Sequence, residues 1–401
     1  MGNSILTSQV ITREALRILH EKLQFIGRVN RQYDDKFAVS GAKIGDTLNV
    51  RLPNQYVVRR GRKAVPQDTS ERTTPLVVAN QIGVDTEFYS DELTMSLDDF
   101  SKRVLEPAMS TLATNIENDT IANVLPGVYN AVGTPAVTPS TLLQLGQIRQ
   151  KLKNYLAPEG DGRTLLINTD ANASLVDAFK TLFQDGKAVS KQYLEGFVTR
   201  AQSFDLYESN LIPTITAGSR VANAGRTDGA GQVGAALKLK SFAAGATIGA
   251  GEKFTISGVY AVHPETKVAY NFLQKFTTTA AGVNDGSGNF AALAISPAII
   301  TSGAYQNVSA APGDGATITF DQAASASAVT NIGFHRDAFA FVTADLVMPK
   351  GMDMASRIVQ DGISLRFVRG YDINEDQFIS RFDVLHGSAL LRPEFACVLY
   401  G

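Results

Sequence analysis

The chain has 401 residues, of which 44% are hydrophobic and 19% are charged, with 37 Lys and Arg against 39 Asp and Glu. This length allows a large core and roughly two or three domains. The formal net charge of −2 argues against a dedicated nucleic-acid-binding protein, which usually carries a strongly basic domain. Cys397 is the single cysteine, which excludes an intrachain disulfide and a zinc site built from several cysteines.

The first residues carry charged side chains at short intervals and lack the apolar stretch of a signal peptide. No run approaches the roughly 18 apolar residues that a transmembrane helix requires. We therefore expect a protein that is made and folded in a cytoplasm and that has no membrane partner.

Residues 8–29 have the spacing of an amphipathic helix. Their apolar side chains recur every three or four residues and form one stripe, and a polar segment follows them. We expect this helix to be an arm that docks on a surface elsewhere. The residues of the stripe are Ile11, Ala15, Leu19, Leu23 and Ile26.

Residues 46–89 read as a β-hairpin with a long basic tip. Apolar and polar residues alternate along both legs, as in strands with one covered face. The alternating apolar residues are Leu48, Val50 and Leu52 on the outgoing leg and Val84, Thr86 and Phe88 on the return. The tip carries Arg59, Arg60, Arg62 and Lys63. An isolated two-stranded ribbon is marginal in water, so we expect this hairpin to lie on another surface.

A long helix is predicted from Ser96 to about Val124. Ser96 and Asp99 resemble a capping box, and Pro107 is expected to kink the helix in its first third. The apolar stripe of this helix comprises Phe100, Val104, Ala108, Leu112, Ile116 and Val124.

The region that follows mixes helix and strand patterns. Residues 140–156 predict an amphipathic helix and residues 163–168 a short buried strand. Asp170 is expected to cap a further helix, and residues 203–216 predict a strand with a turn in it.

The composition changes between about Thr214 and Thr330, where Gly, Ala, Ser and Thr dominate. Six short strand candidates are separated by turn signals such as NDGSGN and PGDG, which suggests a small barrel or sandwich. They begin at residues 236, 253, 267, 290, 304 and 316. Mixed helix and strand patterns resume at residue 331, so the region reads as a domain inserted into another. Three further strand-like runs close the chain, at 364–372, 378–387 and 394–401.

No group of residues forms a convincing catalytic, cofactor or metal site. GAGQVGAA, at 229–236, matches the dinucleotide-binding fingerprint, but neither a buried strand before it nor a helix after it is predicted. We therefore interpret it as a flexible glycine loop. The four histidines lie in separate segments and are expected to be structural; they are His20, His263, His335 and His386.

A terminal arm, a long hairpin and an inserted β module share one property. Such protrusions expose apolar edges and unpaired backbone groups that a monomer cannot easily satisfy. They make sense if neighbouring copies of the chain cover them. The alternative is a hairpin that folds back on its own domain.

The order of these elements resembles the major capsid (coat) proteins of tailed bacteriophages, which have the HK97-like fold. Within that family it resembles the P22-type branch, which carries an inserted β-barrel domain. NSILTSQVITREALRILHEKL resembles the N-terminal arm, residues 44–93 the E-loop hairpin, and LATNIENDTIANVL the spine helix. FHRDAFAF followed by RFVRGYD and DVLHG is the most telling part of the resemblance.

The resemblance implies an α+β fold of the HK97-like capsid type with an inserted all-β, barrel-like domain. It also implies an order of domains along the chain. The expected parts are an N-terminal arm (1–40), the E-loop hairpin (41–89), the P-domain spine helix (90–130), the A-domain (131–213), the inserted β-barrel domain (214–330), the A-domain return (331–370) and the C-terminal P-domain strands (371–401).

The function that the resemblance implies is self-assembly, without enzymatic activity, into the icosahedral head shell of a double-stranded DNA phage. Its implied partners are further copies in pentamers and hexamers, a scaffolding protein, a portal protein and, through weak non-specific contact, the packaged DNA. The shell would form in the host bacterial cytoplasm. The implied neighbour contacts are Leu48, Val50, Leu52, Arg59, Arg60, Arg62 and Lys63 in the E-loop, and Ile11, Ala15, Leu19, Leu23 and Ile26 in the N-terminal arm.

Two other classes of protein stay open at this point. A bacterial surface or adhesin-like β protein would suit the Gly-, Ala- and Thr-rich region, although the missing export signal and the helical first half count against it. An enzyme with an unrecognised site is the third possibility, and the lack of clustered His, Asp, Glu or Cys counts against it.

Overall fold

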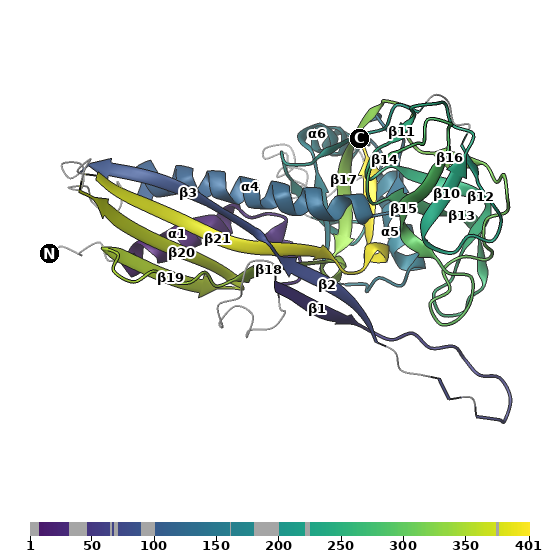
Figure 1. The fold of residues 1–401 in the computed structure, drawn as a ribbon, viewed down its shortest axis with the longest axis horizontal. Coiled ribbons are helices and arrows are strands. Elements are labelled where there is room, and N and C mark those ends of the chain that lie inside the picture. The colour runs from purple at the N-terminus through teal and green to yellow at the C-terminus, as the bar shows by residue number, and fades with distance from the viewer. Residues whose placement is uncertain are drawn as a thin grey trace. The chain divides into compact units, whose positions relative to one another are not determined.

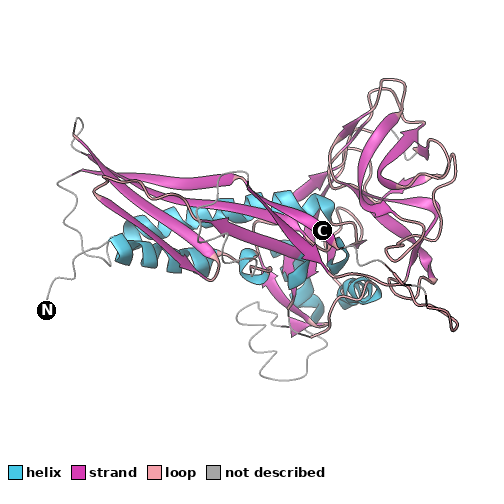
Figure 2. Cartoon of the chain, turned by 60° about the horizontal axis from the view of Figure 1, so that its bottom comes forward, coloured by secondary structure: helices cyan, strands magenta, loops and turns pink. Residues whose placement is uncertain are grey.

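The computed structural model describes residues 8–31, 46–64, 66–67, 71–89, 101–160, 162–179, 200–220, 225–373 and 377–401. The chain divides into two compact units, and each is built from segments that are far apart in the sequence. The first comprises Met1–Arg51, Thr73–Asn123 and Phe339–Leu391, and the second comprises Leu52–Arg72, Val124–Ala338 and Arg392–Gly401. Figure 1 labels the elements along the chain, and Figure 2 distinguishes helices from strands.

The first unit is organised around a five-stranded antiparallel sheet. Its central strand is the long β21 (Gln377–Leu390), and β3 (Asn80–Tyr89) pairs along one edge of it. The other edge of β21 is shared by β20 (Ile363–Asp372) and β18 (Phe339–Ala344). β19 (Met354–Gln360) pairs with β20 and completes the sheet. One face is apolar, with the rings of Phe367 and Phe382 4.9 Å apart.

α1 (Ser8–Lys22) is the helix that the N-terminal spacing predicted. Its apolar face packs on β19 and β20, and Ala15, Leu16 and Leu19 are completely buried there. The Nε2 atom of His20 lies 3.0 Å from the carbonyl oxygen of Gln360, the last residue of β19. A short 3-10 turn, η1 (Ile26–Arg28), follows the helix.

α4 (Glu106–Val124) is the long helix of the first unit and runs alongside β3 and β21 (Figure 1). A π-helical turn, η2 (Ser101–Leu105), directly precedes it. Pro107, where a kink is expected, is the second residue of α4 and lies directly after this change in helix type, where the missing N–H of a proline is tolerated. The expected caps Ser96 and Asp99, and the stripe residue Phe100, lie outside the described residues.

Glu117 of α4 connects this helix to the segment that follows α1. The side chain is almost fully buried, and its Oε1 atom accepts the backbone N–H groups of Phe25 at 2.5 Å and Ile26 at 3.3 Å. Burial raises the pKa of the Glu117 carboxyl to about 7, while the N–H donors and the charge of Arg28 oppose the rise.

β1 (Asp46–Leu52) and β2 (Arg72–Val78) form a two-stranded ribbon. Leu76 and Val78 of β2 are buried, and the backbone of β2 comes close to β21 at Gly387. A Cβ atom on Gly387 would lie only 2.2 Å from the carbonyl oxygen of Val77. Glycine is therefore required here because the two backbones approach too closely for a side chain.

The second unit contains a mixed sheet around β17 (Ser327–His335). β17 pairs antiparallel with β22 (Ala396–Tyr400) on one edge and with β5 (Arg163–Ile167) on the other. The remaining strands of this sheet are β4 (Ala131–Val132) beside β22, β7 (Phe204–Glu208) beside β5, β6 (Arg200–Ala201) beside β7, and β8 (Thr214–Thr216) beside β17.

Two helices accompany this sheet. α5 (Leu142–Asn154) packs on β22 and β4 and begins with a capping box between Thr141 and Gln144. α6 (Thr169–Phe179) begins differently from the prediction: Asn168 Oδ1 accepts the N–H of Ala171 at 3.2 Å. Asn168 is therefore the capping residue, and Asp170 lies in the first turn, where its charge suits the helix dipole.

A second sheet of six strands lies between β8 and β17 in the sequence. Its strand order is β16-β12-β13-β15-β10-β9. The sheet closes into a barrel because Arg226 of β9 forms a bridge with Thr317, next to β16. The strands are β9 (Arg226–Thr227), β10 (Gly234–Lys240), β12 (Lys253–Val262), β13 (Ala269–Thr278), β15 (Phe290–Ile299) and β16 (Ile318–Phe320), with the short pair β11 (Thr247–Ile248) and β14 (Gly282–Val283) beside them.

The longer barrel strands follow the sequence prediction, whereas the two-residue β9 was not predicted and one predicted strand is absent. Residues 304–309, expected to form a strand, instead form a loop with a single bridge between Val308 and Ala261. The barrel interior is filled by large apolar side chains, including Phe254, Phe276 and Phe290. Outside the barrel, β19 was not predicted, because its sequence MASRIVQ shows no strong alternation.

Candidate functional site

The segment between β1 and β2, residues 53–71, is a loop that we call the basic arm. Residues 53–64, 66–67 and 71 of it are described, and none of these lies in a strand. The Gln67 side chain joins the two legs: its Nε2 donates to the carbonyl oxygen of Val57 at 2.6 Å, and the Val57 N–H donates to its Oε1 at 2.8 Å. One side chain thus takes the place of a strand ladder.

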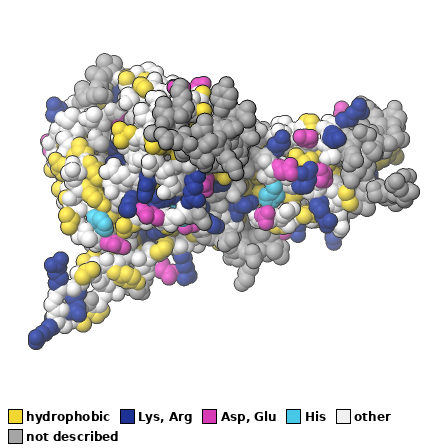
Figure 3. All heavy atoms as spheres, turned by 180° about the vertical axis from the view of Figure 1, so that it is seen from behind, with side chains coloured by type: hydrophobic (Ala, Val, Ile, Leu, Met, Phe, Trp, Pro, Cys, Tyr) yellow, Lys and Arg dark blue, Asp and Glu magenta, His cyan; other side chains and the backbone are white. Residues whose placement is uncertain are grey.

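The basic arm combines exposed apolar and cationic side chains. Tyr56, Val57 and Val58 are 54%, 43% and 81% exposed. The four cations expected at the tip are all exposed, and within the described part of the chain none of them forms an ion pair; they are Arg59, Arg60, Arg62 and Lys63. Figure 3 shows Lys and Arg side chains gathered on the arm, at the lower left. The described arm residues therefore offer apolar and positively charged surface together.

The hairpin itself differs from the sequence prediction. The partner of β1 is β2, while residues 80–89 form β3 and pair with β21 in the sheet of the first unit. Val50 is only 5% exposed and belongs to the chain's own core, so its expected contact with a neighbour does not fit the structure. Leu48 and Leu52 are half-buried. The reason is that β1 gains an apolar cover from its own chain, which alternation alone cannot reveal.

The N-terminal helix also differs from the expectation. The five residues assigned to a contact elsewhere are at most 5% exposed, and they are buried within the first unit; they are Ile11, Ala15, Leu19, Leu23 and Ile26. Their stripe covers β19 and β20 of the same chain. These side chains are therefore a part of the core and not a free contact surface, because an amphipathic stripe takes whichever apolar face lies within reach.

An apolar groove lies on the sheet of the first unit, on the face opposite Phe367 and Phe382. It has a volume of about 610 Å³ and is lined by Met352, Val368, Tyr371, Ile373 and Ile379, among others. Ile373 is 81% exposed and Tyr371 48% exposed. Two arginines also line the groove, and each forms an ion pair: Arg366 with Asp383 and Arg381 with Asp85.

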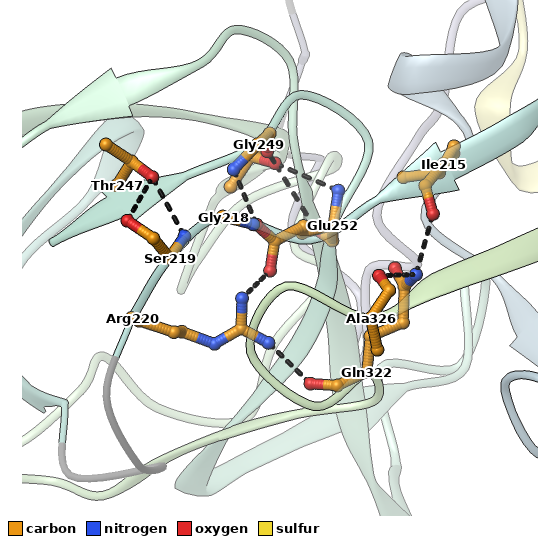
Figure 4. A network of polar contacts seen from close by, with 10 residues as sticks. Ile215, Gly218, Ser219, Arg220, Thr247, Gly249, Glu252, Gln322 and Ala326 are labelled. Carbon is orange, nitrogen blue, oxygen red and sulfur yellow. Dashed lines mark hydrogen bonds and ion pairs between the residues drawn. The ribbon is translucent and has the colours of Figure 1, made fainter.

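A buried polar network holds the base of the barrel (Figure 4). Arg220 donates to Glu252 with both side chains withdrawn from water, at 0% and 1% exposure. Glu252 Oε1 also accepts the N–H groups of Gly218 and Gly249. Arg220 donates through Nη2 to the carbonyl oxygen of Gln322, and its guanidinium lies 3.8 Å from the ring centroid of Phe320. The charges are thus compensated inside the protein, as a buried ion pair requires.

Further hydrogen bonds attach the barrel to the rest of the second unit. Thr277 donates to the carbonyl oxygen of Pro126 at 3.0 Å, and Ser296 to that of Gly127 at 3.1 Å. Both acceptors lie in the 3-10 turn η3 (Leu125–Gly127). The Tyr155 hydroxyl meets Gln274 Oε1 at 3.0 Å. Side chains from β13 and β15 therefore hold the barrel against η3 and the segment after α5.

A cluster of lysines lies at the same junction. Lys253 is 1% exposed and donates to the carbonyl oxygen of Gly251 at 3.0 Å, and burial lowers its pKa to about 8. Lys275 pairs with Asp321, which also accepts the Tyr400 hydroxyl at 3.4 Å. Burial raises the pKa of the nearby Cys397 thiol to about 12, which leaves this cysteine protonated and inert at neutral pH.

Several motifs found in the sequence are structural in the described residues. The fingerprint-like 229–236 is a turn leading into β10, and Gln232 bonds to the backbone of Asp228, Gly229 and Lys238. The described residues contain no group of three or more potential metal ligands. Within the same residues, no helix combines the length and apolarity needed to cross a membrane.

The sequence identified the cationic tip but not its apolar neighbours. Tyr56, Val57 and Val58 follow Pro53 and precede the cations, and their consecutive placement resembles neither a helix nor an alternating strand. The groove could not be foreseen either, because Met352, Tyr371 and Ile379 come together only when β20 and β21 pair.

Comparison with known proteins gives one family match. Residues 212–401, slightly less than half of the chain, match the P22 coat protein family (P22 coat protein, gene protein 5). This part contains the barrel, the strands β17 to β22 and the C-terminus. No curated protein sequence matches the chain.

Solved structures resemble the chain at low sequence identity. Mycobacterium phage Che8 is 12% identical, with a TM-score of 0.47 over 94% of this chain and 90% of that one. The asymmetric unit of the bacteriophage PhiM1 mature capsid is 9% identical, with a TM-score of 0.41 over 89% and 82%. The CUS-3 coat protein I-domain is 23% identical, with a TM-score of 0.19 over 25% of this chain and 96% of its own.

The family match covers the barrel and the strands that carry the two most telling sequence runs, FHRDAFAF and RFVRGYD with DVLHG. These residues form sheets and a filled barrel, and they serve as structure. This match supports a major capsid protein whose copies form the shell of a phage head, with residues 212–401 similar to the P22 coat protein family.

Proposed function

We propose that this capsid protein follows the HK97-like plan with an inserted β-barrel, and that the basic arm of each copy lies across an adjacent copy in an icosahedral shell of pentamers and hexamers. The observation that carries the proposal is the arm itself. It exposes Tyr56, Val57 and Val58 next to four cations that form no ion pair with the other described residues, and the Gln67 side chain joins its two legs. Exposed apolar and charged surface of this kind is typical of a contact site.

The pairing of β8 with β17 supports the idea of an inserted domain. Thr214–Thr216 lies opposite Ser327–Val329, so the chain leaves for the barrel and returns from it on adjacent strands. Everything between them can be added to a host fold without disturbing its order of strands. In this reading, the first unit contains the spine helix and the P-domain sheet, and the sheet around β17 belongs to the A-domain.

The apolar groove is the receiving surface that we propose for the arm of a second copy. Ile373 and Tyr371 are exposed in its lining. Burying Tyr56, Val57 and Val58 of a second copy against them would remove apolar surface from water and so stabilise the contact. A cation of the arm would then lie near Asp372, the carboxylate among the residues that line the groove. An exposed ion pair contributes only ~0–1 kcal/mol, so the contacts are individually weak and wrongly placed copies can separate again.

The remaining partners follow from the same plan. A scaffolding protein would guide assembly, a portal protein would admit the double-stranded DNA, and the DNA would touch the shell weakly and without sequence preference. Assembly would take place in the host bacterial cytoplasm. The buried stripe of α1 leaves only its polar face, with Glu14, Arg17 and Glu21, as a surface of that helix for the scaffolding protein.

The arm's role is tested by reversing its charges in pairs. Arg59→Glu with Arg60→Glu should reduce shell formation at least tenfold in sedimentation and electron-microscopy assays, while circular dichroism of the unassembled protein stays unchanged. The matched control is Lys238→Glu with Lys350→Glu, which changes the net charge equally at exposed positions outside the arm. Shells of normal yield from the arm variant would refute the proposed role.

A further inference from the structure

Arg72 stands where the basic arm ends and β2 begins. Its guanidinium carbon lies 4.7 Å from the ring centroid of Tyr305, within the range of a cation–π interaction. Tyr305 belongs to the loop that follows β15 in the barrel. Both residues lie in the second unit, so the contact joins the root of the arm to the barrel.

A third segment of the chain reaches the same guanidinium. Burial raises the pKa of the Glu394 carboxyl, and the charges of Arg392 and Arg72 act against this rise. Glu394 belongs to η5 (Pro393–Phe395), the turn before β22. Arg72 therefore contacts the Tyr305 ring of the barrel loop and also interacts electrostatically with Glu394 in the C-terminal segment.

The loop that presents Tyr305 is held firmly. The Nζ atom of Lys267 donates to the carbonyl oxygens of Ala304 at 2.5 Å and Gln306 at 3.4 Å, the residues on either side of Tyr305. Asn307 closes the loop by donating from Nδ2 to the carbonyl oxygen of Ala298 at 2.6 Å and accepting the N–H of Ile300 at 3.0 Å. These hydrogen bonds fix the backbone on both sides of Tyr305 and so hold its ring in place.

We propose that Tyr305 is a positioning residue: through Arg72 it sets the direction in which the basic arm leaves the molecule before a second copy is met. This inference rests on the proposed function of the arm in assembly. It adds that the barrel, besides being attached to its own unit, aims the arm.

A contact at the root acts with a long lever. Gly61, in the turn of the arm, lies nine positions after Leu52, so the leg can extend about 30 Å. A change of about 10° at the root then moves the tip by roughly 5 Å, more than the reach of a hydrogen bond. A cation–π contact at a partly exposed site biases an equilibrium by roughly two- to fivefold, which suffices to select one direction without freezing the arm.

The test measures the arm in unassembled protein. Spin labels are placed at Arg60→Cys in the arm and Ser287→Cys on the barrel, while the native Cys397 is fully buried and does not compete for label. The label-to-label distance distribution should be narrow in the parent and in Tyr305→Phe, which keeps the ring. It should broaden in Tyr305→Ala and in Lys267→Met, which frees the loop. Arg72→Gln removes the cation from the other side and serves if Tyr305→Ala fails to fold.

Assembly yield of the same variants separates this inference from the proposed function. A broader distribution together with a two- to fivefold lower yield in Tyr305→Ala, both restored in Tyr305→Phe, supports the inference. An unchanged distribution in both Tyr305→Ala and Arg72→Gln overturns it, whatever the yield. A broader distribution with an unchanged yield overturns the aiming role in assembly, whereas the proposed contact of the arm itself is refuted only by the charge-reversal experiment.

Discussion

Glu252 compensates the charge of Arg220 at the base of the barrel, and neither side chain is accessible to water beyond 1%. The carboxylate simultaneously accepts the N–H groups of Gly218 and Gly249. Gly218 has to be a glycine because a Cβ atom there would lie 2.1 Å from the carbonyl oxygen of Thr247. One pair of side chains therefore secures the point where the chain enters the barrel.

Removing this carboxylate should be strongly destabilising. Glu252→Ala leaves the buried guanidinium of Arg220 without its counter-charge, and the expected loss is about 3–5 kcal/mol in the free energy of unfolding. Urea denaturation followed by circular dichroism measures it. The control is Asp314→Ala at the exposed pair with Lys240, where a much smaller loss is expected because solvent screens the pair. Equal losses in the two variants would contradict the assignment.

The Glu117 carboxyl should make stability depend on pH. Its pKa is raised from 4.5 to about 7 by burial, so between these values the folded chain holds a proton that the unfolded chain releases. Its contribution to the free energy of unfolding therefore falls as the pH rises from about 4.5 to 7, and is constant above. The free energy of unfolding of Glu117→Gln, relative to that of the parent, should rise by at most about 3 kcal/mol between pH 4.5 and pH 8. A difference that does not vary with pH would rule this out.

His386 should have the opposite dependence. Burial lowers the pKa of His386 from 6.5 to about 4, against the opposing charge of Asp119. Among the described residues neither ring nitrogen has a hydrogen-bond partner, and the ring stacks on Phe341 with the centroids 5.7 Å apart. The stability that the neutral ring provides is complete above pH 6.5 and is lost as the pH falls toward 4.

His386→Phe should remove this acid sensitivity and preserve the stacking on Phe341. As the pH falls from 7 to 4, the free energy of unfolding of the variant, relative to that of the parent, should rise by up to about 3 kcal/mol. Because the slopes of Glu117 and His386 oppose each other in this range, the quantity to compare is the variant-minus-parent difference in thermal or urea unfolding. The prediction would be contradicted if the parent and the variant lost the same amount of stability between pH 7 and pH 4.

Gly387 should tolerate no side chain. Gly387→Ala places a Cβ atom 2.2 Å from the carbonyl oxygen of Val77 and 3.1 Å from the Cα atom of Val78, so β2 has to move away from β21. The expected cost is at least about 2 kcal/mol, in the range of overpacked sites. Gly146→Ala, at a half-buried position of α5 where an added Cβ atom would meet nothing within 4 Å, is the control and should be neutral or stabilising. Thermal unfolding compares the two.

Much of the fold was accessible from the sequence because the relevant signals are local. α5 begins at Thr141 with a capping box, β5 contains the apolar residues 165–167, and the barrel strands alternate between glycine-rich turns. α6 shows the limit of such signals. Asn168 and Asp170 are both good capping residues, and only the backbone geometry selects Asn168.

Where the structure differs from the sequence prediction, the difference lies in which segment covers an apolar face. The stripe of α1 and the alternation of β1 were read correctly as apolar faces, yet Leu19 and Val50 are covered by their own chain. The alternation predicts that residues 80–89 form the return leg of the hairpin, whereas they pair with β21, about 300 residues away in the sequence. Alternation specifies that a face is buried, but it carries no information on the partner.

The sequence by itself determined the types of the elements, the barrel-forming region, the cationic tip of the arm and the lack of a recognisable catalytic motif. These depend on periodicity, turn residues and composition, which are properties of neighbouring residues. Only the tertiary structure decided which apolar faces are satisfied within the chain, that Tyr56, Val57 and Val58 stay exposed, and that Tyr305 meets Arg72. The physical reason is that burial and contact are set by segments distant in sequence, whose pairing depends on the whole fold.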